Sequence, residues 1–159
     1  MIDPPEIVQT EARRAAVIPL TIPREEIRSV MGPGLEELYG ALAAQGLTPA
    51  GPWYSYHRRL DPAVFDFEIG VPVDADVAPT GRVRPGERPA ATVARTVYHG
   101  PYEGLGAAWG ELGEWIGERG HGPAPDLWER YLSGPEADPD PETWRTELNR
   151  PLLDDAAGG

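Results

Sequence analysis

The stretch from Tyr98 to Leu132 decides the fold and reads YHGPYEGLGAAWGELGEWIGERGHGPAPDLWERYL. Its pattern predicts a strand end, a Gly-Pro turn, an amphipathic helix, a Gly/Pro-rich loop and a second strand. The helix is expected over residues 101–119, and the strand over 126–132. One side of that helix would carry the apolar residues Leu105, Ala108, Trp109, Leu112, Trp115 and Ile116.

Glu129 lies inside the predicted strand, with aromatic residues close by in the sequence. Because strand side chains alternate, Glu129 and Tyr131 would face one way, and Trp128 and Arg130 the other. A carboxylate buried beside rings is costly unless it is paired, and an arriving cation could supply the partner. Alternatively, Glu129 pairs with Arg130 or another arginine on a solvated face, as most surface carboxylates do.

The rest of the chain shows the same plan twice. In the first half we expect a strand around 15–18, a helix that starts at Pro23, and strands at 53–57 and 64–73. Gly32-Pro33-Gly34 is expected to interrupt the helix, whose apolar spacing then continues from Leu35. In the second half, strands are expected at 91–97 and 143–152 around the stretch quoted above. Residues 74–89, rich in Pro, Gly and charge, are predicted to be a linker, and 153–159 a disordered tail.

The two halves also match at particular residues. Gly32-Pro33 matches Gly100-Pro101, Tyr54-Ser55-Tyr56 aligns with Glu129-Arg130-Tyr131, and Glu68 matches Glu147. We therefore predict one α+β domain over 1–159, made of two strand–helix–strand–strand units, 6–73 and 90–152. The units would be related by a pseudo-twofold axis, with a ligand cleft on that axis.

The side chains expected at that cleft combine one acid with aromatic rings. For Trp109, core packing on the helix is the better explanation, although its ring is also a candidate for the cleft. The candidate ligand-binding residues are Glu129, Tyr54, Tyr56, Trp53, Phe67, Trp109, Tyr131 and Trp144.

Composition excludes several classes of function. The 159 residues carry a net charge of -12 and contain no lysine, which argues against direct binding to nucleic acid. No apolar run is long enough to span a membrane, and no signal peptide is recognisable. Without cysteine, and with His57, His99 and His121 far apart, no metal site is expected. No cofactor-binding motif occurs either, and a cytoplasmic location is the default.

Three segments carry a family likeness: VYHGPYEGL from Val97, with Trp109 and Leu112 after it, then DLWERYLSGP from Asp126 and TWRTELNRPL from Thr143. Together they resemble the GyrI-like small-molecule-binding domain. The likeness covers roughly residues 7–152, because DFEIGVPV from Asp66 also fits the first half. The resemblance implies two strand–helix–strand–strand units with a ligand cleft between them. It also implies that Glu129 is the central acidic residue that faces cationic lipophilic drugs.

The resemblance implies three alternative roles. The first is polyspecific binding of aromatic, lipophilic, cationic small molecules, as in the effector-binding domains of multidrug-responsive transcription activators. The second is hydrolysis of cyclopropane-containing, DNA-alkylating compounds, with Glu129 as general base and Tyr54 or Tyr56 polarising a carbonyl. The third is inhibition of a protein partner, as in the gyrase-inhibitory protein. Regulators of this family carry a helix-turn-helix domain, and no segment here is expected to form one.

Overall fold

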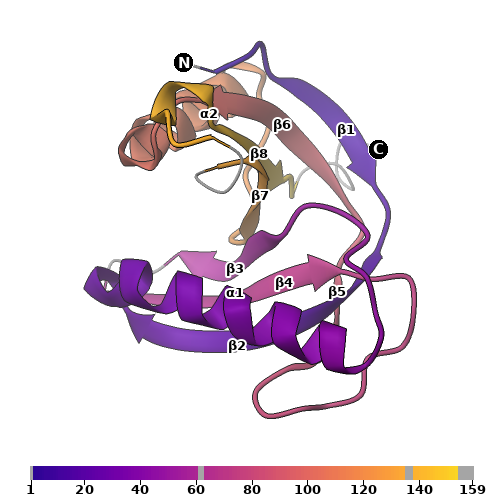
Figure 1. The fold of residues 1–159 in the computed structure, drawn as a ribbon. Coiled ribbons are helices and arrows are strands. Elements are labelled where there is room, and N and C mark those ends of the chain that lie inside the picture. Colours follow the sequence, from indigo (N-terminus) through magenta and orange to yellow (C-terminus); the bar gives the residue numbers. More distant parts are fainter. Residues whose placement is uncertain (1, 61–62, 135–137, 154–159) are drawn as a thin grey trace. The chain divides into compact units, whose positions relative to one another are not determined.

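The computed structural model describes residues 2–60, 63–134 and 138–153, which fall into two compact units. The first unit comprises residues 12–89, and the second comprises 1–11 together with 90–159. Each unit contains an antiparallel sheet and one long helix (Figure 1). The predicted α+β class is therefore confirmed, whereas the single domain over 1–159 stays a prediction.

The first unit is built on the strand order β3-β4-β2-β5. Its elements are β2 (Arg13–Pro23), the short η1 (Arg24–Glu26), α1 (Ile27–Ala44), β3 (Tyr54–Leu60), β4 (Val64–Pro72) and β5 (Arg84–Arg88). Helix α1 contacts β2 and β4. The core between them includes Ala16, Ile18, Leu38, Leu42, Phe67, Ile69 and Val71.

Helix α1 runs through Pro33, so the predicted interruption is wrong. A proline inside a helix removes one backbone hydrogen bond and costs about 3 kcal/mol. Leu38 and Leu42 on the same helix are 0% and 1% exposed. Each such burial stabilises by about 1.5–3 kcal/mol, so packing against the sheet outweighs the local defect.

Residues 74–89 are not simply a linker, because they contain β5, which pairs with β2. The sequence RPGER looked like a loop because proline and glycine are rare inside sheets. An edge strand tolerates both residues, since one of its sides has no partner strand that needs the missing N–H group. β5 lies at the edge of its sheet, which explains why the composition misled the prediction.

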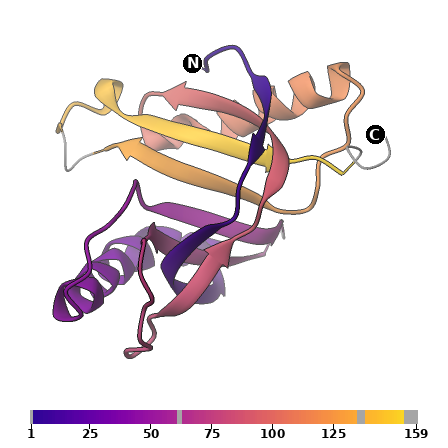
Figure 2. The same cartoon turned by 90° about the vertical axis from the view of Figure 1, so that its right-hand side faces the viewer.

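The second unit has the strand order β1-β6-β8-β7 (Figure 2). Its elements are β1 (Glu6–Thr10), β6 (Ala91–His99), η2 (Tyr102–Gly104), α2 (Leu105–Glu118), β7 (Leu127–Ser133), η3 (Pro141–Thr143) and β8 (Arg145–Pro151). Helix α2 contacts β6. Their core includes Ala94, Tyr98, Ala108, Leu112, Ile116 and Leu148.

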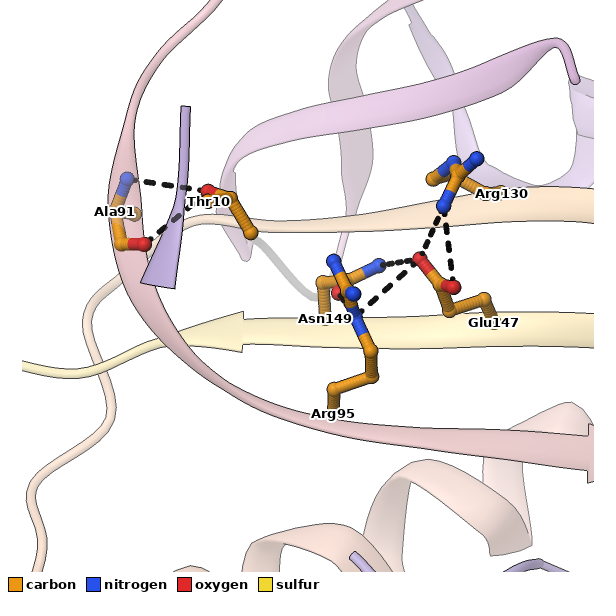
Figure 3. A network of polar contacts seen from close by, with 6 residues as sticks. All are labelled: Thr10, Ala91, Arg95, Arg130, Glu147 and Asn149. Carbon is orange, nitrogen blue, oxygen red and sulfur yellow. Dashed lines mark hydrogen bonds and ion pairs between the residues drawn. The ribbon is translucent and has the colours of Figure 1, made fainter. Parts of the chain in front are cut away.

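β1 pairs with β6, so residues 6–10 join the second unit and not the first repeat, where the sequence had placed them. At the end of this pairing the Thr10 hydroxyl donates to the Ala91 carbonyl at 3.1 Å and accepts from the Ala91 N–H at 3.2 Å (Figure 3). Apart from Leu153, the predicted tail 153–159 lies outside the described residues. Within the described ranges, no helix is long and apolar enough to cross a membrane.

The repeat is real, but its register differs from the sequence alignment by one residue. Both β3 and β7 carry a register shift, between His57 and Arg59 and between Tyr131 and Ser133. When β3 and β7 are aligned at these register shifts, the residue that corresponds to Glu129 is Ser55 and not Tyr54. A slip of one residue moves a side chain to the other face of the sheet. Tyr54 therefore occupies a different kind of position from Glu129.

Two glycine substitutions test the close packing of the Tyr54 ring against Gly70. A Cβ at Gly70 would lie 2.6 Å from the Tyr54 hydroxyl, whereas one at Gly113, in the middle of α2, would meet nothing within 4 Å. We expect Gly70→Ala to lower the free energy of unfolding by about 1–3 kcal/mol because it overpacks the site. Gly113→Ala should raise it by about 0.5–1 kcal/mol, because alanine is the better helix former. Urea unfolding measures both, and equal effects of the two changes would contradict the packing described.

Candidate functional site

Strand β7 presents Glu129 on the face of the sheet that α2 covers. The backbone register pairs Glu129 with Leu148, a core residue that packs with α2. The next residue, Arg130, is paired with Glu147 and points to the opposite face. The predicted alternation along this strand is thus confirmed.

Two neutral groups hold the Glu129 carboxylate. The indole N–H of Trp109, on α2, donates to Oε2 at 2.7 Å. The Tyr131 hydroxyl donates to Oε1 at 2.6 Å. Among the described residues, no arginine or histidine forms an ion pair with Glu129, and Arg130 instead contacts Glu147 at 2.9 Å. The alternative in which Glu129 pairs with Arg130 is therefore wrong.

The surroundings of Glu129 favour its protonated form. Burial raises the pKa of Glu129 above its ordinary value of 4.5, and the hydrogen bonds from Trp109 and Tyr131 offset only part of that rise. The residue nevertheless keeps some exposure to solvent. The site therefore holds a reachable carboxylate that either a proton or a cation would stabilise.

Two further rings extend the site beyond Tyr131. Tyr102 meets Tyr131 edge to face, with centroids 6.1 Å apart, and lies 4.8 Å from the Trp144 ring. Tyr102 follows the Gly100-Pro101 turn, where Gly100 has φ +135°, a conformation that favours glycine. Trp144 was a candidate from its sequence position, whereas Tyr102 was not, although Tyr102 lies in the segment Gly100-Pro101-Tyr102-Glu103.

A buried hydroxyl group near these rings was not among the residues predicted for the site. Thr146 on β8 pairs in register with Tyr131 and is 0% exposed. Its hydroxyl finds no hydrogen-bond partner within the described part of the chain. An unsatisfied polar group of this kind is uncommon in a folded interior and marks a place where a ligand or water could bind.

The remaining candidates belong to the first unit. Phe67 is fully buried in the α1 core and stacks on His57, with centroids 5.0 Å apart. Trp53 is partly buried against the same core. Their positions are explained by packing, and a ligand contact for either remains a prediction.

Tyr54 and Tyr56 form a separate apolar cluster with Ala15 and Val17. Tyr54 is fully buried, and the Arg88 guanidinium lies 5.2 Å from the centre of its ring. Burial raises the pKa of Tyr54 to about 12, so its hydroxyl stays protonated at neutral pH. A role for these two tyrosines at Glu129 also remains a prediction.

Comparisons with known proteins agree with this fold. Residues 3–152 match the GyrI-like small molecule binding domain, and the chain belongs to this family. No curated protein matches the chain. The crystal structure of the EcmrR C-terminal domain has a TM-score of 0.83 at 19% identity, over 94% of this chain and 97% of that one. In an EcmrR–DNA complex the TM-score is 0.79 at 20% identity, and the match covers 95% of this chain but only 57% of EcmrR.

Two other structures carry information on ligands or activity. SAV2435 bound to tetraphenylphosphonium has a TM-score of 0.64 at 11% identity, over 95% of this chain and 94% of that one. A hydrolase encoded by lin2189 from Listeria innocua has a TM-score of 0.65 at 14% identity, over 94% and 91%. At such low identities, these likenesses show the fold alone. Among the described residues, no group of three or more acids or histidines could hold a metal ion.

The raised pKa of Glu129 predicts a specific dependence of stability on pH. Below about pH 4.5, the group is protonated in both the folded and the unfolded state and carries no penalty. Between that pH and the raised pKa, the unfolded state has lost the proton that the folded state still holds. The free energy of unfolding of the wild type therefore falls as pH rises towards the raised pKa. Glu129→Gln removes this loss, and its stability relative to wild type should increase with pH.

Urea unfolding at a series of pH values from 4 to 8 measures this trend. Glu114→Gln removes the same charge from an exposed position on α2 and should follow the wild type. If wild type and Glu129→Gln differ by the same free energy at every pH, the pKa of Glu129 is not raised.

Proposed function

We propose that this chain binds aromatic, lipophilic cations beside the Glu129 carboxylate. One observation carries the proposal: both carboxylate oxygens are held by neutral donors, and no described residue supplies a positive charge. A buried charge without a counter-charge is unfavourable, and a bound cation would remove that cost. Attraction between the two charges is also stronger in a partly desolvated site than in water.

The aromatic rings around Glu129 would provide the apolar contacts to such a cation. Trp109 and Tyr131 both contact the carboxylate, and Tyr102 extends the aromatic surface from Tyr131 to Trp144. Aromatic faces attract cations, and flat rings provide apolar contact without requiring a particular hydrogen-bond pattern. Such a surface suits ligands that share charge and aromatic character but differ in shape.

The comparisons support this choice of ligand class. The chain belongs to a family of small-molecule-binding domains, and SAV2435, which shares the fold, is bound to tetraphenylphosphonium in its structure. Tetraphenylphosphonium has one positive charge surrounded by four phenyl rings, and it is therefore the natural first probe. A cytoplasmic location, expected from the sequence, and a protein partner, which belongs to the third alternative role, stay predictions.

Tryptophan-fluorescence titration with tetraphenylphosphonium and with neutral triphenylphosphine oxide tests the proposal. We expect the cation to bind at least about tenfold tighter, which corresponds to about 1.4 kcal/mol. Glu129→Gln should abolish that preference, whereas Glu114→Gln should retain it. Because ionised Glu129 binds the cation, affinity in the wild type should also fall as pH drops through the raised pKa of Glu129.

Equal affinity for the cation and the neutral compound, or a preference that survives in Glu129→Gln, would rule out the charge role of Glu129. The pH dependence provides an independent check, because it too should disappear in Glu129→Gln but persist in Glu114→Gln.

A second candidate function is hydrolysis at the same carboxylate. The observation that favours it is the raised pKa of Glu129 together with the Tyr131 hydroxyl 2.6 Å away. A carboxylate with a raised pKa is a better general base, because it holds a proton taken from water more readily. In this proposal Glu129 takes one proton of a water molecule, and the water oxygen bonds to a cyclopropane carbon of the substrate. The ring C–C bond at that carbon breaks, its electron pair passes to the conjugated carbonyl, and that group gains a proton as the ring-opened product forms. Tyr131 replaces Tyr54 as the hydroxyl nearest the reaction.

Hydrolysis is tested by incubating the protein with a cyclopropane-containing alkylating compound in ¹⁸O-labelled water and following the product by mass spectrometry. General-base catalysis contributes roughly 10²–10⁴-fold to a rate, so Glu129→Gln should slow turnover by at least about a hundredfold. Glu114→Gln should leave the rate unchanged. Binding of the compound with no ¹⁸O in any product would exclude the hydrolase and leave the binding function in place.

A further inference from the structure

The sheet of the second unit carries a separate polar network (Figure 3). The strand register places this network on the face opposite Glu129. Arg130 Nη1 donates to both oxygens of Glu147, at 2.9 and 3.1 Å. Arg95 Nε donates to Asn149 at 2.7 Å, and the Asn149 amide donates to Glu147 at 3.0 Å. Glu147 is 7% exposed and Asn149 is 0% exposed. Both side chains of this network that accept or donate at its centre are therefore buried.

The two arginines of the network have one ion-pair partner between them. The guanidinium groups of Arg95 and Arg130 share the single buried carboxylate of Glu147. The exposed Glu6 on β1 lies opposite Arg95 in register, but within the described residues it forms no ion pair with Arg95. An anionic group could therefore still pair with one of the guanidinium groups.

The two arginines also retain unused hydrogen-bond donors. Within the described residues, neither Nη atom of Arg95 has an acceptor, and Nε of Arg130 is buried without one. A buried N–H group that lacks an acceptor costs about 1–3 kcal/mol. The side chains of Arg95 and Arg130 are 26% and 25% exposed, so a small solute can reach part of each guanidinium group, although not the buried Nε of Arg130.

The first unit shows that the fold itself does not need this network. Val17 pairs with Gly70 in the first unit as Arg95 pairs with Asn149 in the second. Tyr56 likewise pairs with Glu68 as Arg130 pairs with Glu147. Equivalent strands therefore form without either of these arginines and without the asparagine. Buried ionic groups can often be replaced by apolar residues without loss of stability, so stability alone does not account for the network.

We propose that Arg95 and Arg130 form a binding site for a carboxylate group on a small ligand. A planar carboxylate accepts two parallel hydrogen bonds from a guanidinium group, and the two Nη atoms of Arg95, which have no acceptor among the described residues, can donate them. The site is distinct from the cation site, because Arg130 and Glu129 are adjacent on β7 and point to opposite faces of the sheet. The two sites would therefore bind ligands of opposite charge.

Nuclear magnetic resonance of the arginine Nε–H groups tests the proposal directly. The probe is benzoate, with benzamide as a neutral compound of the same shape. We expect benzoate to shift the Nε–H signals of Arg95 and Arg130 saturably, and to bind at least about tenfold tighter than benzamide. The tetraphenylphosphonium titration should leave these two signals in place, which separates this site from the one at Glu129.

Arg95→Val supplies the matched variant, because valine stands at the equivalent position in the first unit and the Arg130–Glu147 contact is retained. It should abolish the preference for benzoate, whereas Arg84→Val, at an exposed position on β5, should not. Arg95→Lys keeps the charge but not the planar donor group and should weaken benzoate binding severalfold. If benzoate shifts the arginine Nε–H signals no more than benzamide does, the proposal is wrong. It is also wrong if folded Arg95→Val still prefers benzoate to benzamide. The wild-type titration decides the matter even where a variant fails to fold.

Discussion

Burial of the Glu129 carboxylate between α2 and β7 is the constraint on which the chemistry of the second unit depends. Ala108 and Leu112 anchor α2 in the core at 1% and 0% exposure. Trp109 lies next to them on the same helix, so the packing that secures α2 also brings the indole N–H to 2.7 Å from Glu129. The acid is thus positioned by the hydrophobic core and not by an opposite charge, which leaves its charge available to a ligand.

Alternation along one strand separates two electrostatic environments. Glu129 and Arg130 are neighbours in sequence, yet each has different partners because they project from opposite faces of β7. Arg130 contacts Glu147, whereas the partners of Glu129 in the described part of the chain are the neutral donors of Trp109 and Tyr131. Pairing the two neighbours with each other would have neutralised both. The sheet prevents this pairing, so that within the described residues Glu129 has no ion-pair partner on one face, while Arg95 and Arg130 share Glu147 on the other.

Much of the fold was readable from the sequence, because each helix and strand is marked by its own apolar spacing and by Gly or Pro at its ends. The position of Glu129 on β7 was predictable for the same reason. Long-range pairing was not: β1 joins β6 across about eighty residues, and the correct register of the repeat depends on register shifts in β3 and β7. A shift of one residue is invisible in composition, yet it decides that Ser55 and not Tyr54 corresponds to Glu129.

The most direct test of the central claim is the pKa of Glu129 itself, measured by ¹³C nuclear magnetic resonance of its side-chain carboxyl group. The titration is run with and without saturating tetraphenylphosphonium. The account predicts a pKa above the ordinary 4.5 in the free protein and a lower pKa once the cation is bound. An ordinary pKa in the free protein, or a raised pKa that the cation leaves unchanged, would contradict it.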